Sequence, residues 1–445
     1  MYLLYSILLT LGVVVLLPRF LLDALRHGKY VAGLGERLGK VPALERDGRP
    51  VVWLHSVSVG ETQAARPLVQ ELRQRFPNYK LVVSTITLTG QRVAREVFRN
   101  EAALVFYFPF DWRWTVRRTL RAINPAVVLI METELWPGFL RECRRRKIRT
   151  AMVNGRLSER SFRRYRLLRS FISRVVCDLD LALMQAEADA ARIRALGLAP
   201  ERVQVTGNIK FDASVDASEQ GLTAELRARF ALGNERPLIV AASTHAPEER
   251  IVIEAFKEAS KASAAHAPRL LIAPRHPERF AETASLLNNS GLTWSRRSAV
   301  TTASDKECDA ILLDSIGELR AVYPLAEMVF VGGSIAPVGG HNVLEPAAAG
   351  KCIVTGAHTF NFAAIMRVFT KANALVELPP VTDDEAVAAL STVFSELLAD
   401  KERRQELAAR ARSIMEQNRG ATARTVEMLS PLLDSRQGAK TQRRD

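Results

Sequence analysis

The chain has 445 residues, 48% hydrophobic and 25% charged, which is globular in composition and too long for one ordinary core. Its four cysteines include no Cys-x-x-Cys pair, which argues against a disulfide framework and a zinc site. The net charge of +14 is uneven, since residues 1–210 hold 35 Lys and Arg against 18 Asp and Glu. Such an excess is either a solvated basic face or a surface for an anionic partner: nucleic acid, phospholipid headgroups or a phosphorylated substrate.

The first segment, Met1–Pro18, carries no charged side chain, and Arg19, Arg26 and Lys29 follow it. Its length approaches the roughly 20 apolar residues that cross a bilayer, although it could also lie in the interface. No basic region precedes it and no small-residue cleavage site directly follows, so we do not expect a cleaved signal. The positive charges on its C-terminal side predict a membrane anchor with the body of the protein in the cytoplasm. An anionic phospholipid surface is therefore favoured over nucleic acid, for which no zinc-finger, RNP or basic-zipper motif is present.

Short apolar runs then alternate with longer amphipathic segments, a pattern typical of parallel sheets with helices on both faces. The strands expected in a first sheet are Val51–Leu54, Leu81–Ser84, Leu104–Tyr107, Val127–Met131, Thr150–Val153, Leu181–Met184 and Val203–Thr206. A polar stretch, residues 213–222, reads as a linker. The strands expected in a second sheet are Pro237–Ala242, Leu270–Ala273, Ala310–Leu313, Met328–Val331 and Cys352–Thr355.

The predicted fold class is therefore α/β, with two Rossmann-like, doubly wound domains that face each other across a cleft. Residues 1–25 form the anchor, 26–212 the first domain, 213–435 the second domain and 436–445 a disordered tail. Ligands of such folds bind at the carboxyl ends of the strands.

Several enzyme motifs are absent. The run Gly33–Gly39 has the wrong glycine spacing for a dinucleotide fingerprint and follows no strand. The chain also lacks G-x-x-x-x-G-K-[ST], H-E-x-x-H and G-x-S-x-G. Dehydrogenase, P-loop NTPase, zinc hydrolase and serine hydrolase functions lose their main support, and we expect no cofactor and no metal.

The run HSVSVGE, His55–Glu61, places a carboxylate where the first strand gives way to a helix. One glycine and no lysine do not make a phosphate loop. Glu61 is either a first-turn acid that the helix dipole favours or a group that faces the ligand cleft.

The most informative loop follows the strand Met328–Val331 and contains two glycine pairs before His341 and Asn342. Asn342 is the predicted N-cap of a helix whose N–H groups would favour a phosphate. Glu345 would accept hydrogen bonds from a ribose diol, or would complete a capping box with Asn342.

Three further loops at strand ends belong to the same prediction. They contain Ser243, Thr244 and His245 in AASTHAPEE, Arg275 and His276 in APRHPERF, and Gly317 and Glu318 in DSIGELR. Since Arg is well shaped to bind phosphate, the four loops together predict a nucleotide pocket.

Eight segments, in order between about residues 33 and 365, resemble the bacterial Kdo transferases, which add 3-deoxy-D-manno-octulosonic acid (Kdo) to a lipid A precursor. They are HSVSVGET, METELWPG, NGRLSERS, VTGNIKFD, STHAPEE, LIAPRHPERF, VGGSIAPVGGHNVLEPAAAGK and TGAHTFNF. The resemblance implies a GT-B fold, CMP-Kdo as donor, lipid IVA as acceptor, and a place at the bacterial inner membrane in lipopolysaccharide core biosynthesis.

The resemblance also implies roles for single residues. Glu61 takes the place of the catalytic base, and Glu132 and Lys210 take the places of groups that stabilise the transition state. The places that hold CMP fall on Pro274, Arg275, Ile316, Gly317, Glu318, Asn342, Val343, Leu344 and Glu345. Ile316 stands where some relatives have Met, at a position we expect to be read through its backbone.

The chemistry that follows is an inverting glycosyl transfer. A carboxylate removes the acceptor proton on one face of the sugar, and CMP leaves from the other as a stable anion that needs no acid. Glu132 could instead only orient Lys210 or an arginine, and Glu134 is expected to be structural. His55, His276 and His341 either line the pocket or are ordinary loop histidines. The arginines of 144–147 and 160–174 either contact headgroups and lipid A phosphates or form a solvated face.

Two other functions compete with this one. The first is a GT-B enzyme that transfers from a UDP-sugar to a polyprenyl lipid, which a preference for uridine over cytidine would reveal. The second is a nucleotide-binding membrane scaffold without catalysis, which would not need Glu61, Lys210 and the donor loop together.

Overall fold

The computed structural model describes residues 1–27, 33–212, 217–233, 236–262 and 267–434. The described chain divides into two compact units. The first unit combines Met1–Asp212 with the segment from Asn418 onward, and the second unit is Ala213–Gln417. Each unit contains one seven-stranded sheet whose described strand pairs are all parallel. The predicted α/β class is confirmed, and the predicted tail 436–445 lies outside the described residues.

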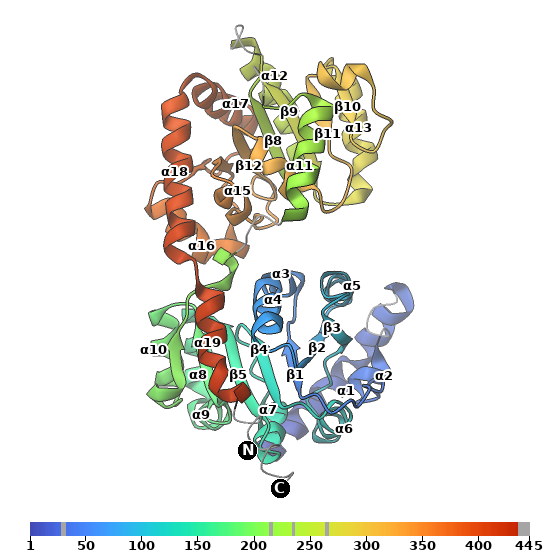
Figure 1. Cartoon of the computed structure of the whole chain (residues 1–445), viewed down its shortest axis with the longest axis vertical. Helices are drawn as coiled ribbons and strands as arrows, with labels where there is room; N and C mark the ends of the chain where they lie inside the picture. Colours follow the sequence, from blue (N-terminus) through green and yellow to red (C-terminus); the bar gives the residue numbers. More distant parts are fainter. Residues whose placement is uncertain (28–32, 213–216, 234–235, 263–266, 435–445) are drawn as a thin grey trace. The chain divides into compact units, whose positions relative to one another are not determined.

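The first sheet has the strand order β3-β2-β1-β4-β5-β6-β7 (Figure 1). Its strands are β1 (Val51–His55), β2 (Lys80–Thr85), β3 (Ala102–Tyr107), β4 (Val127–Met131), β5 (Arg149–Gly155), β6 (Leu181–Met184) and β7 (Val203–Val205). All seven runs predicted as strands are strands. The five residues of β1 are buried because helices cover both faces of the sheet.

The alternation of β1 side chains divides the core of the first unit between the two faces. Val51 and Trp53 belong to one cluster, and Val52 and Leu54 belong to the other. The covering helices are α1 (Tyr2–His27), α2 (Leu34–Arg37), α3 (Val59–Ala64), α4 (Arg66–Arg75), α5 (Leu88–Val97), α6 (Arg113–Ile123), α7 (Pro137–Arg145), α8 (Glu159–Leu167), α9 (Arg169–Val176), α10 (Glu187–Ala195) and α19 (Ala421–Asp434).

The second sheet has the order β10-β11-β9-β8-β12-β13-β14. Its strands are β8 (Leu238–Thr244), β9 (Arg269–Pro274), β10 (Trp294–Arg296), β11 (Ala310–Leu312), β12 (Met328–Val331), β13 (Cys352–Thr355) and β14 (Val376–Glu377). The five predicted strands are present, but the two edge strands β10 and β14 were not predicted. Both are short and only partly buried, so neither shows a continuous apolar run.

The helices of the second unit are α11 (Ala217–Phe230), α12 (Glu248–Ala262), α13 (Phe280–Ser290), α14 (Leu319–Val322), α15 (Leu344–Ala348), α16 (Ala363–Lys371), α17 (Asp383–Ala399) and α18 (Lys401–Asn418). The stretch 213–222 was interpreted as a linker, but α11 begins inside it at Ala217. Residues 213–216 lie outside the described residues.

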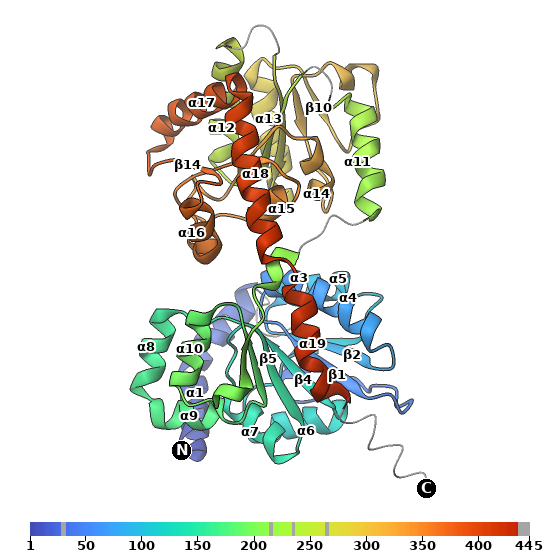
Figure 2. The ribbon, with the colours of Figure 1, turned by 60° about the vertical axis from the view of Figure 1, so that its left-hand side comes forward.

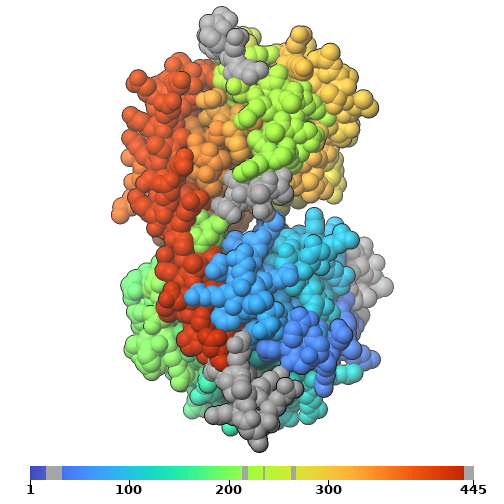
Figure 3. Space-filling model, viewed as in Figure 1, coloured from blue at the N-terminus to red at the C-terminus, as the bar shows by residue number. Residues whose placement is uncertain are grey.

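The C-terminal helix α19 belongs to the first unit, so the predicted extent of the second domain, to residue 435, is wrong. The two carboxylate oxygens of Asp212 accept hydrogen bonds from the N–H groups of Gly420 (2.7 Å) and Thr422 (2.5 Å), which fixes the start of α19. Val426, Leu429 and Leu433 of α19 are buried in the same cluster as Leu54. Figures 2 and 3 show α19, in red, against this unit. The sequence shows one long helical run, because the break at Gly420 (φ 84°) depends on a contact far along the chain.

The N-terminal helix α1 is held to the first unit through polar groups on one of its faces. Tyr2 and Tyr5 donate hydrogen bonds to the carboxylates of Asp178 (2.8 Å) and Asp111 (2.9 Å). Many of the described apolar side chains of α1 are exposed, among them Leu3, Leu4, Leu8, Leu11 and Val15. Within the described part of the chain, no helix combines the length and the hydropathy that a membrane span requires.

The packing of α19 predicts unequal effects for two neighbouring substitutions. Leu429 is fully buried, whereas Met428 is 38% exposed. We expect Leu429→Ala to lower the free energy of unfolding of the first unit by about 2–5 kcal/mol, because it leaves a cavity. Met428→Ala, the matched control, should change it by less than about 0.5 kcal/mol.

Denaturant unfolding followed by tryptophan fluorescence measures this difference. Four of the five tryptophans belong to the first unit, and Trp294 of the second can be replaced by Phe in both variants. Equal midpoints for the two variants would mean that α19 does not stabilise the first unit.

Candidate active site

Both sheets contain a point at which the order of strand addition reverses, between β1 and β4 in the first and between β8 and β12 in the second. In open parallel sheets the loops that follow such strands diverge and form a ligand site at the carboxyl edge. Glu61 and Glu132 follow β1 and β4, Asn342–Glu345 follow β12, and the other candidates follow further strands at the same edges.

Glu61 lies in the first turn of α3, after β1. The hydroxyl of Ser58 caps the helix by accepting from the N–H of Glu61 (3.3 Å). The Glu61 carboxylate accepts hydrogen bonds from the N–H of Val57 (2.7 Å) and from the hydroxyl of Ser58 (3.0 Å). The side chain is therefore a first-turn acid, as one of the two interpretations expected.

The surroundings of Glu61 also alter its acidity. The residue is 9% exposed. Burial raises the pKa of Glu61 above its ordinary value, and the negative charge of Glu132 adds to the rise, while the hydrogen bonds from Val57 and Ser58 and the charge of Lys210 oppose it. A buried carboxylate of raised pKa is suited to accept a proton.

Glu132 follows β4 directly and has a left-handed backbone, with φ at 53°. Its N–H donates to the carbonyl of Val153 (2.9 Å). Its carboxylate forms an ion pair with the Lys210 ammonium at 2.7 Å, and both side chains are about one quarter exposed, at 23% and 26%. The ion pair that one of the two interpretations required is present, and the unfavourable backbone of Glu132 makes it a candidate functional position.

Lys210 is placed by two asparagines that the sequence analysis did not single out. The side-chain oxygen of Asn208 accepts from the N–H of Lys210 (3.0 Å), and that of buried Asn154 accepts from the N–H of Ile209 (3.1 Å). The motifs NGRLSERS and GNIKFD therefore meet at one loop. In the sequence, only the presence of one Asn in each motif, Asn154 and Asn208, hinted at this placement of Lys210.

Glu134 joins this group although it was expected to be structural. Burial, and then the negative charges of Glu61 and Glu132, raise its pKa to about 7. Among the described residues, Glu134 has no hydrogen-bond partner for its carboxylate. Three carboxylates and one ammonium thus interact at this edge, and the negative neighbours favour the protonated form of Glu134.

The second unit brings the predicted CMP residues to a single edge. Pro274 ends β9 and Arg275 follows it, Ile316–Glu318 follow β11, and Asn342–Glu345 follow β12. Strands β11, β9, β8 and β12 are neighbours in that order, so these loops adjoin one another. The carboxylate of Glu318 is held by the guanidinium of Arg297, at 2.7 and 3.2 Å. Arg275 is exposed, and no ion pair involves it in the described parts of the chain.

The predicted capping role of Asn342 is wrong. The N-cap of α15 is Val343. Asn342 forms a turn before the helix, since its side-chain oxygen accepts from the N–H of Leu344 (3.1 Å) and its amide group donates to Glu345 (3.3 Å). A capping box is not formed, because Glu345 accepts from a side chain instead of a backbone N–H. Burial raises the pKa of Glu345.

The carboxylate of the fully buried Glu248 lies against the first glycine pair of the loop, Gly332–Gly333. One oxygen of Glu248 accepts from the N–H groups of His245 (2.9 Å) and Gly333 (2.7 Å). The other accepts from the N–H groups of Ser334 (2.9 Å), Ile335 (2.9 Å) and Ala336 (3.2 Å). These five N–H groups serve Glu248 and are not available to a phosphate. The sequence analysis missed this role, for which the acid pair in STHAPEE was the only signal.

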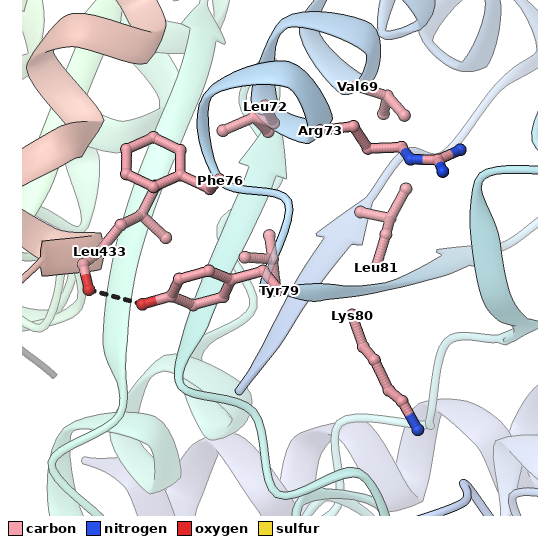
Figure 4. Close-up of a pocket in the computed structure, with 9 residues that line it drawn as sticks. Val69, Leu72, Arg73, Phe76, Tyr79, Lys80, Leu81 and Leu433 are labelled. Carbon is pink, nitrogen blue, oxygen red and sulfur yellow. Dashed lines mark hydrogen bonds between the residues drawn. The ribbon is translucent and has the colours of Figure 1, made fainter. Parts of the chain in front are cut away.

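A small pocket in the first unit lies at the opposite edge of its sheet (Figure 4). It is lined near the amino ends of β1 and β2, by Val52 and Leu81, and by α4 and Leu433. The Tyr79 hydroxyl donates to the carbonyl of Leu433 at 2.5 Å. This pocket is part of the contact with α19 and is separate from the loops that carry Glu61 and Glu132.

Comparisons with known proteins identify the family. Residues 32–213 match the model of the 3-deoxy-D-manno-octulosonic-acid transferases. The 3-deoxy-D-manno-octulosonic acid transferase of Haemophilus influenzae is 32% identical over 413 residues, which cover 92% of this chain and 94% of that protein. The chain belongs to the Kdo transferase family. The enzyme of that name from Bordetella pertussis is 36% identical over 388 residues, 86% of this chain and 87% of that protein.

A solved structure supports the fold of this family member. UDP-GlcNAc 2-epimerase from Neisseria meningitidis is 11% identical, with a TM-score of 0.56, and covers 86% of this chain and 100% of that chain. At this identity the likeness concerns the fold alone, which agrees with the GT-B class that the resemblance implied.

The role of Glu248 predicts a local loss of order. We expect Glu248→Gln to speed hydrogen exchange of the amides of residues 333–336 by at least about 10-fold, because an amide cannot accept on both sides. Glu254→Gln is the control on the same helix, since Glu254 only pairs with Arg250 at the surface. Mass spectrometry of peptides that contain residues 333–336 reads out both variants. Unchanged exchange in Glu248→Gln would show that these hydrogen bonds do not hold the loop.

Proposed function

We propose that this Kdo transferase moves Kdo from CMP-Kdo to a lipid A precursor, lipid IVA, in lipopolysaccharide core biosynthesis. The observation that carries the proposal is the grouping of Glu61, Glu132 and Lys210 at the carboxyl edge of the first sheet, in a chain of this family.

Glu61 acts as the general base in this proposal. It takes the proton of the attacking acceptor hydroxyl as the oxygen bonds to the anomeric carbon of Kdo. The bond from that carbon to the phosphate oxygen of CMP breaks on the opposite face, so the configuration inverts. The raised pKa of Glu61 brings its basicity closer to that of a group working near neutral pH.

Lys210 and Glu132 stabilise the transition state as one unit. The ammonium supplies positive charge, and the carboxylate at 2.7 Å holds it in place. Protonation of Glu134, which its raised pKa favours, limits the repulsion that three ionised carboxylates would impose.

The second unit holds CMP in this proposal. Arg275, which has no described ion pair, provides a cation for the phosphate, and Glu345 accepts hydrogen bonds from the ribose. The backbone of Pro274, Ile316 and Gly317 lies beside the cytosine of CMP. Glu318, which Arg297 holds in place, borders the same side of the nucleotide. Asn342, Val343 and Leu344 provide the turn that leads to Glu345.

We further propose that the protein works at the cytoplasmic face of the bacterial inner membrane and binds anionic phospholipids. The exposed apolar side chains of α1 support this proposal, as do Trp114 (54% exposed), Leu167 (84%) and Leu168 (62%). Trp112, beside Trp114, donates to Thr10 of α1 (3.1 Å), so α6 and α1 adjoin. Arginines of α6 and α7 add positive charge, which suits an anionic surface.

The first experiment uses detergent-solubilised protein, CMP-Kdo and lipid IVA, with mass spectrometry of the lipid. We expect a gain of one or more Kdo masses, and a loss of rate of at least about 100-fold in Glu61→Gln. The acid limb of the pH–rate profile should lie above the ordinary carboxyl pKa of 4.5, since the ionised base is required and its pKa is raised. Glu132→Gln removes a negative neighbour and should move this limb to lower pH, whereas Lys210→Met should move it to higher pH.

Glu96→Gln, at an exposed position of α5, is the matched control and should keep the wild-type rate. Full activity in Glu61→Gln would remove the proposed base. Transfer from a UDP-sugar with none from CMP-Kdo would favour the competing GT-B function.

Membrane binding predicts a position-dependent effect of a new charge. Leu8→Glu, on the exposed face of α1 (58% exposed), should weaken co-sedimentation with phosphatidylglycerol-rich vesicles by about 10-fold. Val300→Glu, at an 87% exposed position of the second unit, is the control and should bind as the wild type. Binding should also fall as salt rises, because the basic side chains contribute. Equal binding of both variants would argue against α1 as the membrane surface.

A further inference from the structure

Two histidines of the second unit meet in a way that the proposed function has not used. The Nε2 atoms of His245 and His341 are 2.8 Å apart. The ring planes are within 5° of parallel and the centroids are 5.1 Å apart, so the two rings meet edge to edge. His276 contacts His245 edge-on, at 5.2 Å between centroids. The three rings follow β8, β12 and β9, at the edge where the predicted CMP residues lie.

The backbone is built around this histidine pair. A Cβ atom at Gly333 would lie 2.9 Å from Cδ2 and 3.0 Å from Nε2 of His341, and 3.5 Å from Cδ2 of His245. Gly333 also has a left-handed φ of 67°. The same oxygen of Glu248 that binds the N–H of Gly333 binds the N–H of His245. Glycine at 333 and the carboxylate of Glu248 thus place the two imidazoles together.

The contact between the imidazoles limits their protonation. At 2.8 Å, one Nε2 donates and the other accepts, so a single proton lies between them. A proton on both Nε2 atoms would make two donors face each other and drive the rings apart. The contact therefore excludes the state in which both Nε2 atoms carry a proton, and burial, which lowers the pKa of both rings, favours the uncharged pair.

The groups around the histidine pair are mainly cationic. Arg275 and His276 face it from the loop after β9, and Arg279 faces it from the turn that follows. Glu249 of α12 is the facing acid for His245, and it is already paired with Arg279 at 2.9 Å. Burial, and then Arg275, lower the pKa of His341 to about 3, and burial and His276 lower that of His245. A ligand that suits such a cationic cluster is an anion.

We propose that the His245–His341 pair is the subsite for the phosphate of the nucleotide, and that it takes up one proton when that phosphate binds. The phosphate replaces the contact between the rings, each Nε2 donates one hydrogen bond to a phosphate oxygen, and the additional proton comes from solvent. No covalent bond changes in this step. The inference rests on the proposed function, since it assumes a CMP donor.

Isothermal titration calorimetry of the full chain in detergent tests the proton uptake. CMP is titrated at pH 7.5, where its phosphate, with a second pKa of about 6, is mostly a dianion. Buffers of different ionisation enthalpy give the number of protons taken up. We expect about one proton per CMP bound and none with cytidine, which has no phosphate.

Two variants separate the histidine pair from the rest of the pocket. Glutamine keeps an N–H donor but cannot be protonated, so His245→Gln with His341→Gln should abolish the uptake and weaken CMP binding by about 10- to 100-fold. Arg275→Gln should also weaken binding, but the uptake should remain, because arginine does not titrate. Thermal melting checks that the variants fold, and the comparison of CMP with cytidine needs no variant.

Each other outcome rejects a defined part of the inference. Wild-type protein that binds CMP with no proton uptake overturns the subsite and leaves the proposed function intact. Uptake with free Kdo but not with CMP overturns the phosphate in favour of the sugar carboxylate. No CMP binding to folded wild-type protein overturns both the donor and the subsite.

Discussion

The buried carboxylate of Glu248 holds the carboxyl edge of the second sheet together. Strands β8 and β12 end side by side, and the chain leaves them in loops whose N–H groups have no sheet partner. A buried charge is unfavourable unless it is saturated with hydrogen bonds, and here five N–H groups supply them. The first unit uses the same device, with Asp111 bound by the N–H groups of Gly138 (2.8 Å) and Phe139 (2.6 Å). Carboxylates thus organise the loops from which both candidate sites are built.

The electrostatics of the two sites are opposite, although both lie at equivalent edges of similar sheets. The first edge has Glu61, Glu132 and Glu134 around one ammonium. The second has an exposed arginine and three imidazoles. The large basic excess of residues 1–210 is therefore not located around Glu61. Part of it lies on α6 and α7, where Arg113, Arg117 and Arg145 converge on Glu142.

The sequence predicted the parts of this structure that depend on local pattern. Strands buried on both faces are continuous apolar runs, which is why β1, β4, β8 and β12 were predicted at nearly the observed bounds. The loops that follow them were predicted as sites because acids, arginines and glycines stand at strand ends. Contacts between segments distant in the sequence could not be predicted from such local patterns. The capture of α19 by Asp212, the placement of Lys210 by Asn154 and the enclosure of Glu248 each join residues that no periodicity links. The prediction of Asn342 as an N-cap was wrong for a local reason, because an Asn side-chain oxygen can form either a turn or an N-cap.

The glycine pair Gly332–Gly333 changes how anion binding in the second unit should be understood. A loop of free N–H groups would be a permanent partial positive charge. Here the N–H groups are taken by Glu248, and the glycines allow an imidazole contact instead. A neutral histidine pair adds no charge to the empty pocket, but on the proposed proton uptake it becomes cationic only while a phosphate is bound. In the proposed transfer the product is CMP, a stronger anion than the donor ester, and it must leave before the next turnover. A pair that returns its proton to solvent as CMP departs provides charge for the leaving phosphate without leaving a permanently cationic trap for the product.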